Sequence, residues 1–265
     1  MVFYFGYGSN INLVSLRAKG VEPISSERGI LNGWKLTFNV QHWFMHEGGM
    51  GNIQPSSDIN DYVEGIVHCL HDEHLAALDA MESYGVGYDR IEVNVETANG
   101  LIRAQAYIGL PDFLDNDCLP SRRYLNIITR GAEAAGLSMA YLEKLRSHPL
   151  LVVEDYPDFV FPADQVLPFN QQTLALNPQY TAIAGAVFDM REARPKLESL
   201  HVLFGGKDMT LFHLKRHDTS TGNETIDDYI NGSITEGQKK YLNAYLHEYL
   251  KEFRYVGRYV YEDAS

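Results

Sequence analysis

Residues 1–13 of the chain read MVFYFGYGSNINL, from Met1 to Leu13. The apolar run from Val2 to Phe5 predicts a short β-strand. This strand leads directly into Gly6-Tyr7-Gly8-Ser9-Asn10, where two glycines let the backbone approach another group closely. Such a segment is either an ordinary turn or a loop whose N–H groups bind an anion or a developing oxyanion. Motifs further along the chain help to distinguish the two.

The composition narrows the function classes. The chain has 265 residues with 45% hydrophobic content, enough for one large or two medium domains. A net charge of −13 makes it a poor binder of nucleic acid and of anionic membranes. No apolar run approaches the roughly 20 residues of a membrane span, and no secretory leader is recognised. The two cysteines, Cys69 and Cys118, have no metal-type spacing, so we expect reduced thiols, no metal and a cytoplasmic location.

Hydrophobic periodicity predicts a mixture of strands and helices in the first half. Four further strands are predicted, at residues 33–40, 62–70, 90–96 and 101–108. Asn99-Gly100 joins the last two and is a strong hairpin signal. Helices are predicted at Asp72–Glu82 and Ser121–Gly136, and each begins with a residue that can cap it.

The second half starts after a break in these patterns. Residues 148–162 hold three prolines and no periodicity, which favours a linker between domains at 1–150 and 160–265. Residues 180–189 predict a hairpin around Ala184-Gly185, and residues 235–253 predict the clearest helix of the chain. That helix carries a stripe of tyrosine and leucine that we expect to pack within its own region, with the barrel as an alternative partner: Tyr241, Leu242, Tyr245, Leu246, Tyr249 and Leu250.

One carboxylate stands where the pattern predicts an apolar residue. Leu75, Leu78 and Glu82 follow the i, i+3, i+7 spacing, so Glu82 falls on the apolar side of its helix. A partly desolvated carboxyl group suits proton transfer. The alternative is a last helical residue whose side chain is simply in water.

The order of these motifs resembles that of the γ-glutamylcyclotransferase family, over about residues 1–150. The resemblance is carried by the YGSN loop, the Leu78-Asp79-Ala80-Met81-Glu82 segment, Tyr88, Pro120-Ser121-Arg122-Arg123-Tyr124, and Gly131 to Leu137 with Tyr141 to Leu145 after it.

The resemblance implies an α+β fold with a small mixed β-barrel and flanking helices. It also implies an enzyme of glutathione metabolism, an acyltransferase or lyase, that cyclises a γ-glutamyl amino acid to 5-oxoproline without a cofactor. Glu82 corresponds to the catalytic acid and base. The positions that correspond to substrate contacts are Tyr7, Gly8, Ser9, Asn10, Gly49, Tyr88 and Tyr124. One residue fewer than usual separates Glu82 from Tyr88.

Residues 160–262 resemble the heme-binding cytochrome b5-like fold, closest to the membrane-associated progesterone receptor branch. The resemblance lies in Gly185 to Asp189, Leu203 to Thr210, Ile234 to Gln238 and Tyr255 to Arg258. The position of that branch's axial tyrosine holds His201, and the segment before it is two residues shorter. We therefore expect a smaller α+β module in which heme is not favoured. His213 and His217 have i, i+4 spacing but no third ligand in view, so we expect surface residues.

Other functions remain open from the sequence. A cyclotransferase fold without turnover could bind a ligand, a partner or heme, and an active one could act on a γ-glutamyl amine or a natural-product amide. The sequence does not identify the leaving amine or the oligomeric state.

Overall fold

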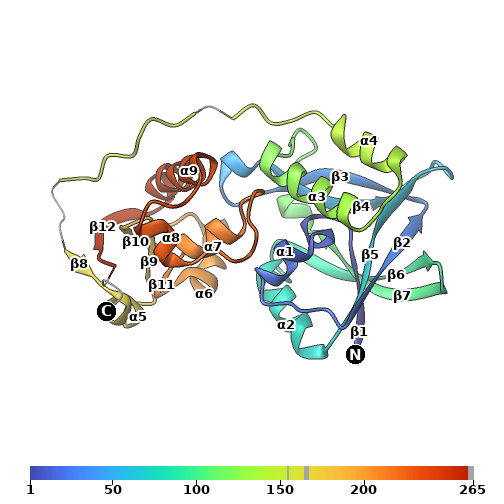
Figure 1. The fold of residues 1–265 in the computed structure, drawn as a ribbon, viewed down its shortest axis with the longest axis horizontal. Helices are drawn as coiled ribbons and strands as arrows, with labels where there is room; N and C mark the ends of the chain where they lie inside the picture. Colours follow the sequence, from blue (N-terminus) through green and yellow to red (C-terminus); the bar gives the residue numbers. More distant parts are fainter. Residues whose placement is uncertain (154, 164–166, 262–265) are drawn as a thin grey trace. The chain divides into compact units, whose positions relative to one another are not determined.

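The structure is a computed structural model that describes residues 1–153, 155–163 and 167–261. The chain forms two compact units, Met1–Val152 and Val153–Ser265, coloured blue to green and yellow to red in Figure 1. The division falls inside the proline-rich stretch 148–162. Within the described residues, no helix combines the length and the apolar character needed to cross a membrane.

A closed five-stranded barrel forms the centre of the first unit, in the order β1-β5-β2-β6-β7. Its neighbouring strands are antiparallel except β1 and β7, which pair in parallel at Tyr4 and Gln105 and so close the barrel. The barrel strands are β1 (Val2–Gly6), β2 (Ser25–Asn32), β5 (Tyr62–Leu70), β6 (Tyr88–Thr97) and β7 (Gly100–Gly109). A separate pair consists of β3 (Trp34–Gln41) and β4 (Gly49–Pro55).

Four α-helices accompany the barrel: α1 (Leu13–Arg17), α2 (Asp72–Met81), α3 (Arg122–Ala134) and α4 (Met139–Arg146). Three short 3₁₀ turns are η1 (Ser9–Ile11), η2 (Met45–Glu47) and η3 (Pro111–Phe113). The buried faces of α3 and α4 share one apolar core with the barrel, in which Phe5, Val63 and Ile128 are fully buried. The α+β class and the small barrel with flanking helices are confirmed.

Local signals predicted most of these elements. The β6–β7 hairpin turns at Ala98-Asn99, and the Ser121 side chain accepts a hydrogen bond from the Tyr124 N–H at the start of α3, as expected. The predicted cap of α2 was wrong, because His71 rather than Asp72 is its N-cap residue. Strand β2 was missed because its sequence, SSERGILN, begins with four polar residues and shows little alternation.

The second unit has its own five-stranded sheet, ordered β11-β9-β10-β12-β8. Its strands are β8 (Pro168–Phe169), β9 (Tyr180–Ile183), β10 (Ala186–Asp189), β11 (Lys207–Asp208) and β12 (Arg254–Tyr259). Its helices are α5 (Gln171–Ala175), η4 (Pro195–Leu197), α6 (Leu200–Phe204), α7 (Thr210–Lys215), α8 (Ile226–Ile230) and α9 (Glu236–Glu252). The expected hairpin is present as β9 and β10.

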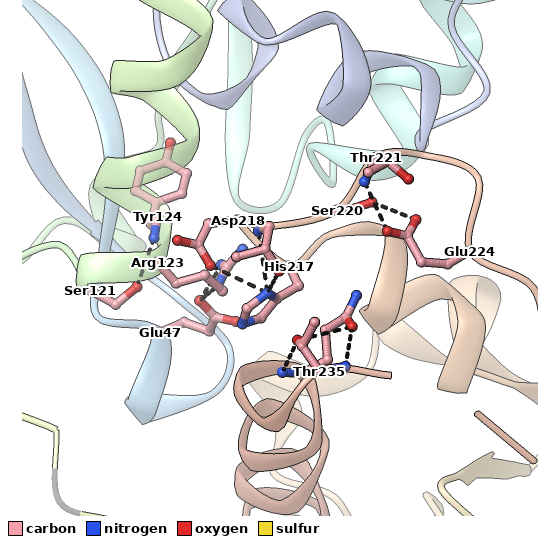
Figure 2. A network of polar contacts seen from close by, with 12 residues as sticks. Glu47, Ser121, Arg123, Tyr124, His217, Asp218, Ser220, Thr221, Glu224 and Thr235 are labelled. Carbon is pink, nitrogen blue, oxygen red and sulfur yellow. Dashed lines mark hydrogen bonds and ion pairs between the residues drawn. The ribbon is translucent and has the colours of Figure 1, made fainter. Parts of the chain in front are cut away.

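Helix α9 begins at a capping box in which Thr235 and Gln238 exchange hydrogen bonds; Thr235 is labelled in Figure 2. Most of the predicted stripe is buried, but Leu250 is 41% exposed, so its placement in the stripe was wrong. His213 is also not the expected surface residue. Its ring lies 3.8 Å from that of Tyr245, between centroids, and its Nε2 is 3.1 Å from the Tyr249 hydroxyl.

Candidate active site

Strand β1 delivers the opening glycine-rich loop to the end of the barrel, where η1 turns the chain. A Cβ atom at Gly8 would stand 3.0 Å from the Tyr124 hydroxyl, and one at Gly6 would stand 3.1 Å from the backbone oxygen of Asn10. The glycines therefore provide room for the loop to fold tightly against α3. The φ of Gly8 is −109°, so its conformation alone does not demand glycine.

The loop lines a pocket together with residues from strands β1, β4, β6 and β7, helix α3 and the end of helix α2. Of the residues predicted from the sequence, Tyr7, Gly8, Ser9, Asn10, Glu82, Tyr88 and Tyr124 lie together there. Three lining residues were missed: Tyr4 in β1, Gly51 in β4 and Tyr107 in β7. No local pattern distinguishes Tyr4 and Tyr107 from core residues of a barrel, and Gly51 lies in the separate β3–β4 pair.

Glu82 is the residue at which α2 ends, and it turns its carboxylate toward the loop. Its Oε1 lies 3.2 Å from Asn10 Nδ2 and 3.1 Å from Lys19 Nζ. The side chain is only 18% exposed, which argues against a frayed carboxylate in water. A hydrogen-bonded carboxylate at the edge of a pocket can accept and return a proton.

Asn10 connects this carboxylate to the barrel. Its Nδ2 donates to the Tyr4 hydroxyl at 2.6 Å, and its Oδ1 accepts from Lys19 Nζ at 2.6 Å. Its backbone oxygen accepts from His68 Nε2 at 2.9 Å, and Ser26 donates to Nδ1 of the same ring. Burial lowers the pKa of His68 to about 4, so the imidazole is neutral near pH 7.

Tyrosine side chains line the rest of the pocket, and their hydroxyls are held by the protein. The Gly51 N–H donates to the Tyr124 hydroxyl at 3.0 Å, and the Tyr88 hydroxyl donates to the Gly51 oxygen at 3.0 Å. The Tyr7 hydroxyl donates to the backbone oxygen of Tyr107. Burial raises the pKa of Tyr124 to about 12 and raises those of Tyr7 and Tyr88 well above the ordinary range. These phenols therefore remain protonated near neutral pH.

Tyr124 is positioned by the first turn of α3. Figure 2 shows its backbone N–H bonded to Ser121 and its neighbour Arg123 paired with Glu47. The Arg123 Nε lies 3.0 Å from Glu47 Oε2. This ion pair ties the helix start to η2, just before the strand that carries Gly51.

One predicted glycine lies outside the pocket. A Cβ atom at Gly49 would stand 1.9 Å from the backbone oxygen of Phe38, so this glycine packs against β3 and is not among the pocket residues. Gly51, two positions further along β4, lines the pocket instead. A Cβ there would meet the Tyr124 hydroxyl at 3.1 Å and the Gly8 Cα at 3.7 Å.

In the second unit, His201 lies on α6 with its Nε2 2.9 Å from the backbone oxygen of Met190. Because a carbonyl can only accept, Nε2 carries the proton and donates. Within the described ranges, no three His, Cys, Asp or Glu side chains are grouped so that they could hold a metal ion.

The chain is similar to known proteins over part of its length. The sequence profile of the AIG2-like family matches residues 62–145. A γ-glutamyl cyclotransferase of Claviceps purpurea, gliK, is 26% identical over 144 residues, which are 52% of this chain and 65% of that protein. The chain thus spans just under two thirds of the length of that relative.

Two other known proteins are matched over a larger share of their own length than gliK is. The γ-glutamylcyclotransferase of Mus musculus is 30% identical over 149 residues, 54% of this chain and 77% of that protein. A solved structure described as a γ-glutamyl cyclotransferase is 29% identical with a TM-score of 0.50, over 60% of this chain and 93% of that chain.

Proposed function

Since this chain belongs to the γ-glutamylcyclotransferase family, we propose that its first unit cyclises a γ-glutamyl amino acid or peptide to 5-oxoproline and releases the amine. The relatives carry that name, while the substrate of this chain is our proposal. The observation that supports it best is that Glu82 and Asn10, 72 positions apart, meet at a hydrogen bond on the wall of one pocket.

In this reaction the substrate supplies both the nucleophile and the electrophile, so the protein need not form a covalent bond to it. The substrate's α-amine attacks its own γ-carbonyl carbon, a tetrahedral intermediate forms, and the bond to the leaving amine breaks. Positioning the two ends in a bent conformation supplies much of the rate of such a reaction. In our proposal, the walls formed by Tyr7, Tyr88 and Tyr124 hold the substrate bent.

Glu82 performs the proton transfers in this scheme. Its carboxylate takes a proton from the α-ammonium, which frees the lone pair for attack, and returns it to the departing amine. The second proton, which the attacking nitrogen loses as the lactam forms, passes by the same carboxylate to the released amine, which leaves as an ammonium ion. The carbonyl oxygen gains charge as the intermediate forms, and N–H groups of the Gly8-Ser9-Asn10 loop are the proposed donors to it.

The direct test is incubation of the full chain with a panel of γ-glutamyl compounds and assay of 5-oxoproline. The panel contains γ-glutamyl amino acids, glutathione, γ-glutamyl amines and amides of larger natural products. Release of 5-oxoproline from at least one compound, absent with Glu82→Gln, is expected. Binding of such compounds without release would instead favour a binding protein that has lost turnover.

For the second unit we propose a cytochrome b5-like module without functional heme. The order of hairpin β9–β10, helix α9 and strand β12 is compatible with that arrangement. The residues do not fit a heme ligand set well: His201 already donates through Nε2 to Met190, and the His213 ring packs at a tilt against the Tyr245 ring.

Added hemin tests this part of the proposal. Purified protein should be colourless, and hemin should give no sharp Soret band that depends on His201. A stoichiometric heme spectrum that His201→Ala abolishes would show that the module is a heme protein.

A further inference from the structure

We propose that Lys19 is a positioning residue of the site, which holds Glu82 and Asn10 in the arrangement that proton transfer requires. This inference rests on the cyclotransferase activity proposed above. Lys19 follows helix α1 and is not among the residues that line the pocket. Its ammonium instead contacts three residues that do.

The surroundings of the Lys19 ammonium point to this role. Its side chain is only 4% exposed, although a buried ammonium is costly unless it is paired and hydrogen-bonded. The contacts of its Nζ are 2.6 Å to Asn10 Oδ1, 3.1 Å to Glu82 Oε1 and 3.3 Å to Ser9 Oγ. All three partners line the pocket.

The hydrogen bonds of Lys19 fix the orientation of the Asn10 amide and that of the Glu82 carboxylate. Because Oδ1 of Asn10 accepts from Lys19, its Nδ2 must face Tyr4 and Glu82. Glu82 Oε1 thus receives two donors, the ammonium of Lys19 and the amide of Asn10. A carboxylate held by two donors loses the freedom to swing into solvent, which keeps it aimed at the substrate ammonium.

Lys19 also supplies the positive charge nearest to the carboxylate among the contacts described. The phenols that face Glu82 are neutral near pH 7 because burial raises their pKa: Tyr4, Tyr7, Tyr88, Tyr107 and Tyr124. Behind Asn10, His68 is neutral because burial lowers its pKa to about 4. The Tyr107 hydroxyl donates a hydrogen bond to Asp79 at 2.7 Å, and the Asp79 carboxylate also forms an ion pair with Arg90 at 3.3 Å.

Replacement of Lys19 should therefore change the pH dependence of turnover as well as its rate. In Lys19→Met, we expect kcat/KM to fall by roughly 10²-fold at neutral pH. The acid-side limb of the pH profile should move to higher pH, because loss of a neighbouring cation makes protonation of the base easier. Lys19→Arg keeps the charge and should keep that limb in its wild-type position.

Arg17→Met is the matched control. Arg17 lies two positions earlier in the chain, and its ion pair with Glu22, at 2.7 Å, is exposed. An exposed pair contributes little, so this variant should retain the wild-type rate and pH profile. If Lys19→Met does not fold, Lys19→Gln gives a neutral variant that can still form hydrogen bonds.

A crystal structure of the neutral variant separates this inference from the proposed reaction. The Glu82 carboxylate should leave its place beside Asn10, whether or not any γ-glutamyl compound is turned over. A folded neutral variant with Glu82 in place and an unmoved acid limb would refute the positioning role. If wild type releases no 5-oxoproline from the panel but Glu82 moves in the variant, the reaction is refuted and the positioning role stands.

Discussion

In the proposed reaction, both proton transfers are carried out by one side chain, the carboxylate of Glu82. It is enclosed by hydrogen-bond donors on one side and by phenols that remain neutral on the other. Substitutions at this scale therefore test the proton transfer most directly.

Glu82→Gln preserves the shape of the side chain but removes the base. We expect turnover to fall by ~10²–10⁴-fold or more with little change in folding, because the amide can still accept from Lys19 and Asn10. Steady-state release of 5-oxoproline measures the effect, and circular dichroism checks the fold. Near-normal turnover in the folded variant would end the assignment of Glu82 as the base.

His68 makes stability depend on pH. Burial lowers its pKa from 6.5 in the unfolded chain to about 4 in the folded protein, so the unfolded state binds the proton first as the pH falls. The stabilisation is complete above pH 6.5 and is lost progressively toward pH 4. Between pH 7 and pH 5, this should cost about 2 kcal/mol of the free energy of unfolding.

Urea unfolding of wild type and His68→Gln measures this contribution. Both tryptophans, Trp34 and Trp43, lie in the first unit, so their fluorescence follows the unfolding of that unit. Wild type should lose about 2 kcal/mol more than the variant on going from pH 7 to pH 5. Equal losses in both proteins would show that His68 is not the group responsible.

At the scale of elements, the site depends on how closely the opening loop approaches β4 and α3. Gly8 and Gly51 each lie next to the Tyr124 hydroxyl, where a Cβ atom would stand at 3.0 Å and 3.1 Å. The two glycines therefore let three chain segments meet around one phenol, and a side chain at either position would separate them.

Gly8→Val tests this close approach. The branched side chain should push the loop away from Tyr124 and reduce substrate binding or turnover by at least 10-fold, an estimate of about 1.4 kcal/mol. Gly8→Ala, which adds only the Cβ, should show a smaller loss. Kinetic constants with the best substrate of the panel measure both. A folded Gly8→Val protein with wild-type kinetics would mean that the loop is only a turn.

At the scale of the whole molecule, each unit contains its own sheet and its own apolar core. All residues of the proposed site and the Lys19 support come from the first unit. The second unit contributes none of the pocket residues named above, so its proposed lack of heme does not bear on the cyclisation.

A chain cut near residue 155 tests this independence. The fragment should be soluble, retain cyclotransferase activity and unfold in urea at the same midpoint as the full chain, followed by tryptophan fluorescence. Aggregation of the fragment would indicate that the two halves share a core and that the linker is not a domain boundary.

Elements with local signals could be predicted from the amino-acid sequence alone. Asn99-Gly100 gave the β6–β7 hairpin, and alternation gave β5 within its exact bounds of 62–70. Thr235 and the tyrosine stripe gave α9. The order of the motifs gave the family and pointed to Glu82, while the cytochrome b5-like resemblance and the role of His201 stay predictions. These features are readable because each depends on neighbours within a few residues.

Contacts between residues that are distant in the sequence became visible in the folded chain alone. Closure of the barrel through the parallel β1–β7 contact places Tyr4 and Tyr107 at the site. On strand β4, Gly51 lines the pocket, whereas Gly49 packs against Phe38. Burial of Lys19 against Glu82, 63 positions away, has no local signature either. Contacts between distant segments depend on how the strands pair and how the barrel closes. From the sequence alone, a lysine after a short helix is expected to be a solvent-exposed charge.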